Sequence, residues 1–246
     1  MSLNDRSHPP AVAALQQLHR IKTLELKPIL VEELPLLAAF DAPYLRSLTL
    51  RRARDHHLWS HEALITLPRL FNGIHPLLTE LFLDSVLRIG PNCFAQLTKL
   101  VLHGQFYVDS ADLHSVLDLL EGSPQLADLA FTHCGTAVED DDLASWGNDS
   151  ASSRIPLVHL RRLTVIPMLV PLVGALLRCL ELSQREVVTL LLNPGLPRYK
   201  LRCSDLGAMS QLPILGPFWS DLVGTAERMR ISVTYISEGW DFTLAS

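Results

Sequence analysis

Leu78-Thr-Glu-Leu81-Phe-Leu83 and Leu97-Thr-Lys-Leu100-Val-Leu102 share a pattern with leucine at the first, fourth and sixth positions. The same pattern, with related apolar residues allowed, starts at residues 21, 45, 126 and 160, and a poorer copy starts at Val187. Successive starts lie between 19 residues (78 to 97) and 34 residues (126 to 160) apart. This range includes the roughly 20–29 residues of leucine-rich repeats. We number the positions of this unit from its first leucine.

The residues between the leucines are mostly polar in the first six units, as at Lys22, Thr23, Glu25 and Arg46. Apolar and polar residues that alternate over a short run predict a strand with one buried face. A leucine-rich chain matches a three-leucine pattern often by chance. The alternation therefore carries more of the inference than the leucines do.

Several intervals between the units predict helices, because their apolar residues recur at helical spacing. These intervals are 62–71, 112–120 and 167–182, of which the last is apolar enough to be buried on more than one side. Ser110 or Asp109 is placed to cap the second helix, and Gly122 follows its end.

Strand and helix in alternation predict an α/β fold, a right-handed leucine-rich-repeat solenoid or horseshoe. We expect parallel strands on its concave face and helices on its convex face. A single domain covers 1–246, with about seven irregular repeats in 12–203 and a capping helix and strand in 204–246. Residues 139–153 are acidic and then rich in Ser and Asn, which indicates an exposed, solvated loop.

Composition and charge exclude several classes of function. The chain has 21 basic and 26 acidic side chains, a formal charge of −5, so we expect neither nucleic-acid nor anionic-membrane binding. The longest uncharged apolar run, 165–177, is too short to cross a bilayer and contains two prolines. The N-terminus has no secretory pattern, and the four cysteines form no CxxC pair. A cytoplasmic or nuclear protein is predicted.

Two clusters contain residue types that can carry chemistry. His133-Cys134 resembles the start of a cysteine-phosphatase loop, but Asp140 stands where that loop needs an arginine, so Cys134 is predicted to be a small buried residue. His57 and His61 would lie one helical turn apart and share a metal, but Leu58 stands where the zincin pattern requires glutamate. A polar loop is favoured there. We expect no enzyme activity, metal or cofactor, and an enzyme on another α/β fold is the minor alternative.

The predicted functional surface consists of the polar positions that alternate with the buried leucines. On each strand, positions 3, 5 and 7 point away from the core, so they form three rows across the predicted sheet. Phe82 and Val101 lie side by side in the position-5 row, as an apolar pair among charges. The predicted partner-binding residues are Glu25, Arg51, Glu80, Phe82, Asp84, Lys99, Val101, His103, Asp128 and Arg162.

The first six units and their helices resemble the irregular leucine-rich-repeat regions of F-box proteins, particularly the divergent fungal ones, over roughly residues 12 to 235. Position 9, where that class often has Cys or Asn, holds Cys134. The other units place different residues there: Ile29, Ala53, Val86, Gln105 and Met168.

The resemblance implies a non-enzymatic protein-interaction module, the substrate-recognition part of a ubiquitin-ligase adaptor. Proteins of that class begin with a helical F-box that docks a Skp-type adaptor, and the stretch from Met1 to Gln17 leaves too little chain for it. A Skp-type adaptor is therefore expected only if an F-box is present elsewhere. The alternatives are a scaffolding repeat protein without a ligase link, or an incomplete gene product.

Overall fold

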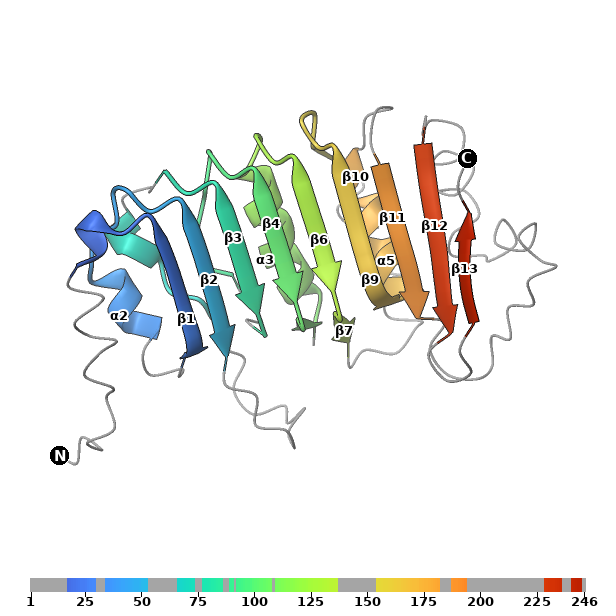
Figure 1. Ribbon diagram of the computed structural model, residues 1–246, viewed down its shortest axis with the longest axis horizontal. Helices are drawn as coiled ribbons and strands as arrows, with labels where there is room; N and C mark the ends of the chain where they lie inside the picture. The colour runs from blue at the N-terminus through green and yellow to red at the C-terminus, as the bar shows by residue number, and fades with distance from the viewer. Residues whose placement is uncertain are drawn as a thin grey trace.

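The fold is α/β and is built on one mostly parallel sheet of nine strands (Figure 1). The computed structural model describes residues 17–29, 34–52, 66–73, 77–85, 89–90, 92–107, 109–136, 154–181, 187–193, 228–235 and 240–244. The strands are β1 (Thr23–Ile29), β2 (Ser47–Arg52), β3 (Glu80–Asp84), β4 (Lys99–His103), β6 (Asp128–Thr132), β9 (Arg162–Leu169), β11 (Val187–Asn193), β12 (Arg228–Tyr235) and β13 (Trp240–Leu244).

The strands lie side by side in chain order, and each is parallel to the next except for the antiparallel pair of β12 and β13. Helices α3 (Ser110–Glu121) and α5 (Val170–Arg178) lie behind the sheet in Figure 1, and α2 (Leu34–Ala38) lies beside β1 at the N-terminal edge. Within the described ranges, no helix covers the opposite face, which we call the open face. Nor does any described helix have the length and apolar character needed to cross a bilayer.

Short elements complete the connections between the strands. Two of these elements are 3-10 turns, and four are two-residue strands that form two small parallel pairs on their own. They are η1 (Leu18–Arg20), η3 (Leu70–Gly73), β5 (Phe106–Tyr107) with β7 (Gly135–Thr136), and β8 (Ile155–Pro156) with β10 (Leu180–Glu181).

Each of the seven predicted units contributes a strand to the sheet. In the first six units the register aligns like positions: Leu81 pairs with Leu100 and Leu100 with Leu129. The seventh unit was placed wrongly by two residues. Val187 pairs with Arg162, so Val188 and Leu190 stand beside the buried Leu163 and Val165.

The core consists of the residues at positions 1, 4 and 6 of the first six units. All of them are buried except Ile21 and Leu26, which are half-buried in the first unit and pack against the core. Burying one leucine side chain contributes about 1.5–3 kcal/mol, so the aligned leucines hold successive strands together.

Backbone hydrogen bonds also repeat from unit to unit. The N–H at position 1 donates to the carbonyl three residues earlier in five units, as from Leu97 to Phe94 (2.9 Å). The carbonyl at position 2 then accepts from two successive N–H groups of the next unit. Lys22, for example, accepts from Arg46 at 2.8 Å and Ser47 at 3.1 Å. Each strand therefore starts from the same turn, which aligns it with its neighbour.

Position 8 distinguishes two ways in which strands of the sheet end. Ser85, Gly104 and His133 hold this position in three successive units, and all have left-handed backbone, with φ of 58°, 59° and 55°. Pro28 and Pro167 hold it in the first and sixth units, and proline cannot adopt a positive φ. The chain does not turn there, and strands β1 and β9 continue to Ile29 and Leu169.

The predicted helices have mixed outcomes. The helix over 112–120 is confirmed as α3, where Asp109 and Asp112 form a capping box and Gly122 is the C-cap. The helix over 167–182 was predicted too long, because β9 extends through Pro167, and α5 covers only Val170–Arg178. Its burial on several sides is confirmed, since residues 172–177 are all buried.

The helix over 62–71 is wrong where it can be assessed. Residues 66–69 are not helical, and the 3-10 turn η3 follows; residues 62–65 lie outside the described residues. The strand predicted over 231–235 is present as β12, but it is not the last, because the unpredicted antiparallel strand β13 follows it. The predicted acidic loop (139–153) and most of the closing helix region (204–227) also lie outside the described residues.

Candidate functional site: the open face of the sheet

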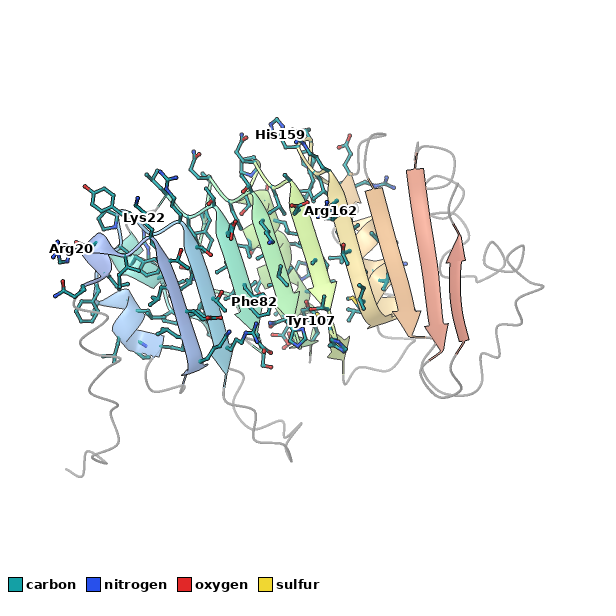
Figure 2. All side chains as sticks on the ribbon, in the orientation of Figure 1. Arg20, Lys22, Phe82, Tyr107, His159 and Arg162 are labelled. Atoms are coloured by element: carbon teal, nitrogen blue, oxygen red, sulfur yellow. The ribbon has the colours of Figure 1, made fainter. Side chains whose placement is uncertain are left out.

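The three predicted rows exist on the open face, because the strand register brings their members together. In the position-5 row, Thr49 pairs with Phe82, Phe82 with Val101, and Val101 with Ala130. The position-3 and position-7 rows are aligned in the same way from β2 to β9. Figure 2 shows Phe82 on the open face and Arg162 near the start of β9.

Nine of the ten predicted partner-binding residues are accessible. Five are exposed: Glu25, Arg51, Glu80, Lys99 and Arg162. Four are half-buried: Phe82, Val101, His103 and Asp128.

Asp84 was predicted wrongly as an accessible residue, because its side chain is only 7% exposed. It is the last residue of β3, and the chain turns directly after it at Ser85. The Ser85 hydroxyl donates to Asp84 Oδ1 at 3.0 Å. The turn therefore occupies the carboxylate and keeps it from a partner.

A stack of four side chains crosses the open face, and we call it the aromatic stack: Arg51, Phe82, His103 and His133. The Arg51 guanidinium carbon lies 4.8 Å from the centroid of the Phe82 ring. The Phe82 and His103 rings lie 6.1 Å apart at an interplanar angle of 24°, and His133 meets His103 edge-on at 5.2 Å. Contacts of this kind contribute about 0.5–1.5 kcal/mol each. The stack therefore holds an aromatic and cationic surface in a defined geometry.

His133 was missed as a site residue by the sequence analysis. It stands at position 8, outside the alternating rows, and reaches His103 because its left-handed backbone turns the chain back toward the sheet. Thr132 adds a further contact, since its Oγ1 lies 2.7 Å from His103 Nδ1. One signal in the sequence could have identified His133. It stands at position 8, the same position as Ser85 and Gly104 in the two units before it.

Charges in the position-3 row alternate in sign from one strand to the next across the sheet: Glu80, Lys99, Asp128 and Arg162. Arg162 lies 3.9 Å from Asp128, and Ser47 Oγ donates to Glu80 at 3.3 Å. Exposed pairs of this kind contribute at most about 1 kcal/mol. This row partly neutralises itself, which leaves the aromatic stack as the distinctive feature of the face.

Position 9 supplies buried donors behind the end of the sheet. Gln105 Nε2 donates to the Leu83 carbonyl at 3.2 Å, and Cys134 Sγ donates to the Leu102 carbonyl at 3.5 Å. Both carbonyls belong to position 6 of the preceding unit. The predicted role of Cys134 as a small buried residue is confirmed.

The environment of Cys134 is unsuited to nucleophilic chemistry. Burial raises the pKa of Cys134 to about 12, although hydrogen bonds from its neighbours oppose the shift. Burial also raises the pKa of the adjacent Tyr107 well above its usual value. A thiol that stays protonated at neutral pH is a poor nucleophile.

The other candidate chemistry has no counterpart in the described part of the chain. His57 and His61 lie outside the described residues. Within the described residues, no group of three or more His, Cys, Asp or Glu side chains is arranged to hold a metal ion.

Comparison with known proteins found no match. No protein-family model, curated protein or solved structure matches the chain.

Proposed function

We propose that the chain is a leucine-rich-repeat-like solenoid that binds a protein partner through its open face without catalysing a reaction. The repeated unit supports the solenoid. A turn, a doubly accepting carbonyl, a five-residue strand, a left-handed residue and a buried donor recur at the same positions. Stacked units that bury leucines only against their neighbours are typical of solenoids.

The aromatic stack is the single observation that carries the binding proposal. Phe82 is half-buried, lies between Arg51 and His103, and has the smaller Val101 beside it in the same row. Aromatic residues and arginine dominate binding energy at protein interfaces, where small neighbours exclude water around them. The stack fits a partner that places an apolar or aromatic side chain against the Phe82 ring.

We further propose that the chain serves as the substrate-recognition part of an F-box-like ubiquitin-ligase adaptor in the cytoplasm or nucleus. This proposal rests on the resemblance of the first six units and on the buried donors at position 9. A scaffolding role without a ligase link is the alternative, since a solenoid offers the same face to either kind of partner.

Site-specific photocrosslinking tests the proposal in cells that produce the protein. A benzophenone amino acid would replace Thr164 on the open face or Asp118 on the exposed side of α3. We expect the Thr164 position to give a discrete crosslinked protein that the Asp118 position does not give. Phe82→Ala should reduce that crosslink at least about fivefold, because truncating a central anchor weakens binding by 1 kcal/mol or more.

Identification of the crosslinked protein separates the two roles. A Skp-type adaptor that co-purifies with the crosslinked pair supports the ligase role, and its absence supports scaffolding. Equal crosslinking from Thr164 and Asp118, or a crosslink that Phe82→Ala leaves unchanged, would contradict binding through the open face.

A further inference from the structure

A second surface lies along the edge of the sheet where the strands begin. It consists of the exposed residues beside position 1 in the first three units, and we call it the rim patch: Arg20, Lys22, Tyr44, Arg46 and Leu77. Tyr44 is 61% exposed and Leu77 is 53% exposed, so two large apolar side chains face solvent. Figure 2 shows Arg20 and Lys22 at this edge, away from Phe82 in the middle of β3 and from Tyr107 beyond the opposite ends of the strands.

The repeat determines how the rim patch is arranged. Arg20, Tyr44 and Leu77 each immediately precede position 1 of a unit, while Lys22 and Arg46 occupy position 2. Because units β1, β2 and β3 are aligned in register, equivalent residues lie about 4.8 Å apart along the edge. The two apolar side chains are thus on neighbouring units, and the three cationic side chains lie beside them on the first and second units.

The backbone beneath the cationic side chains is firmly held. The Lys22 carbonyl accepts two hydrogen bonds from the next unit, and the Arg46 carbonyl accepts N–H groups from Thr79 (2.8 Å) and Glu80 (2.9 Å). Thr79 Oγ1 adds a third bond to Arg46 at 3.1 Å. A surface with an ordered backbone loses less conformational entropy when it binds a ligand.

Two cations of the open face lie near carboxylates, and the cations of the rim patch differ from them in this respect. On the open face, Lys27 pairs with Glu25, and Arg162 lies near Asp128. In the described part of the chain, no carboxylate pairs with Arg20, Lys22 or Arg46. The acidic residues nearby in the repeat are Asp41, four residues before position 1 of the second unit, Glu25, which pairs with Lys27, and Glu80, which receives a bond from Ser47.

We propose that the rim patch binds an acidic segment of a partner protein, one that carries apolar side chains between its carboxylates. The three cations would contact the carboxylates, and Tyr44 with Leu77 would receive the apolar groups. This proposal is independent of the open face, which presents a partly neutralised row of charges.

A protein segment fits the patch better than a nucleic acid does. Nucleic-acid binding requires a longer basic stripe that follows the phosphates, with aromatic side chains for the bases. Here three cations flank two adjacent apolar side chains, only one of them aromatic, on a chain with a formal charge of −5. Carboxylates and apolar side chains mixed along one peptide match that arrangement.

Fluorescence anisotropy with a defined probe tests the proposal on the full chain. The probe is a labelled twelve-residue peptide in which Glu-Glu and Leu-Leu pairs alternate. The comparisons are the same peptide with Lys-Lys in place of Glu-Glu, and a labelled oligothymidylate. We expect the acidic peptide to bind, and its affinity to fall as salt rises from about 50 to 300 mM, because salt screens exposed charges.

Four variants separate the rim patch from general charge and from the open face. The double variant Lys22→Glu with Arg46→Glu should lower the affinity at least about tenfold, and Tyr44→Ala with Leu77→Ala should lower it about fivefold. Arg69→Glu with Arg154→Glu is the matched control, since it reverses two exposed charges elsewhere and should change the affinity less than about twofold. Phe82→Ala should also leave the affinity unchanged.

The proposal would be overturned by no binding of the acidic peptide at low salt, by an equal loss in the Arg69/Arg154 control, or by an equal loss in Phe82→Ala. Tighter binding of oligothymidylate than of the acidic peptide would also overturn it, and would identify the patch as a nucleic-acid surface. Circular dichroism of each variant shows whether a loss reflects unfolding, and the Tyr44/Leu77 variant tests the patch without any charge change.

Discussion

Gln105 and Cys134 occupy the same position in two successive units and make equivalent hydrogen bonds with different chemical groups. An amide and a thiol both donate to the position-6 carbonyl of the unit before, and both are buried. A buried carbonyl without a donor costs about 1–3 kcal/mol, so the position requires a donor more than it requires a particular side chain. Met168, at the same position of the sixth unit, is buried but offers no donor.

Cys134 should make stability depend on pH in the alkaline range. Burial raises the pKa of the folded thiol from 9.0 to about 12, so the folded state disfavours the thiolate. The resulting stability is complete below pH 9 and is lost as the pH rises from 9 to 12. The free energy of unfolding of the wild type, relative to Cys134→Ala, should therefore fall by about 1 kcal/mol between pH 8 and pH 10.

Urea denaturation at the two pH values measures this difference. Cys93→Ala is the control, because the Cys93 thiol is exposed and its removal should leave the wild-type dependence in place. A gap between wild type and Cys134→Ala that stays constant with pH would show that burial does not shift this thiol.

Position 8 decides the length of the strands and the starting points of the elements that follow. Where it is left-handed, the strand ends after five residues, as in β3, β4 and β6. Where it is proline, the strand runs on, and α5 begins only at Val170. In these units and in the first one, the backbone at position 8 therefore separates two kinds of connection.

Two glycines with positive φ, Gly104 at position 8 and Gly90 in the connection after β3, test the backbone requirement of the turns between strands. Gly104→Ala should destabilise the protein by about 1–2 kcal/mol, because an L side chain is strained at φ 59°. Gly90→Ala should cost more, since φ is 64° and the added Cβ would lie 2.4 Å from the Leu67 carbonyl oxygen. Thermal or urea unfolding gives both values, and equal losses would show that the predicted contact at Gly90 is relieved by movement.

Across the described chain, nine strands form one sheet whose order follows the sequence. Every described pairing except β12 with β13 is parallel, so each unit contacts mainly the units before and after it. Distances between equivalent positions should then grow in proportion to the number of strands between them.

Spin labels at position 3 measure that growth. Thr23 and Asp128 are four pairings apart and Thr23 and Arg162 are five, which predicts Cα separations of about 19 and 24 Å. Cysteine pairs at these sites, with Cys93 and Cys203 replaced by serine, would be compared by double electron–electron resonance. A distance to residue 162 no longer than that to residue 128 would contradict an ordered sheet.

The sequence predicted the rows of the candidate site better than it predicted the connections. Thr49, Phe82 and Val101 were aligned correctly, because leucines at fixed positions on parallel strands admit one register. The 62–71 helix failed from residue 66 on, since apolar residues at helical spacing also fit a segment held by long-range bonds. Asn92 provides such bonds, to Pro68 (2.9 Å) and to the Leu70 N–H (2.8 Å).

In the first six units, the amino-acid order alone determined which strand residues face the core and which residues stand beside one another across the strands, because a strand places alternate residues on opposite faces. Only the tertiary structure decided that Asp84 is covered, that His133 reaches His103, and that the seventh strand is displaced by two residues. These features depend on backbone turns and on hydrogen bonds to the next unit. No local pattern of residues specifies such contacts before the units are stacked.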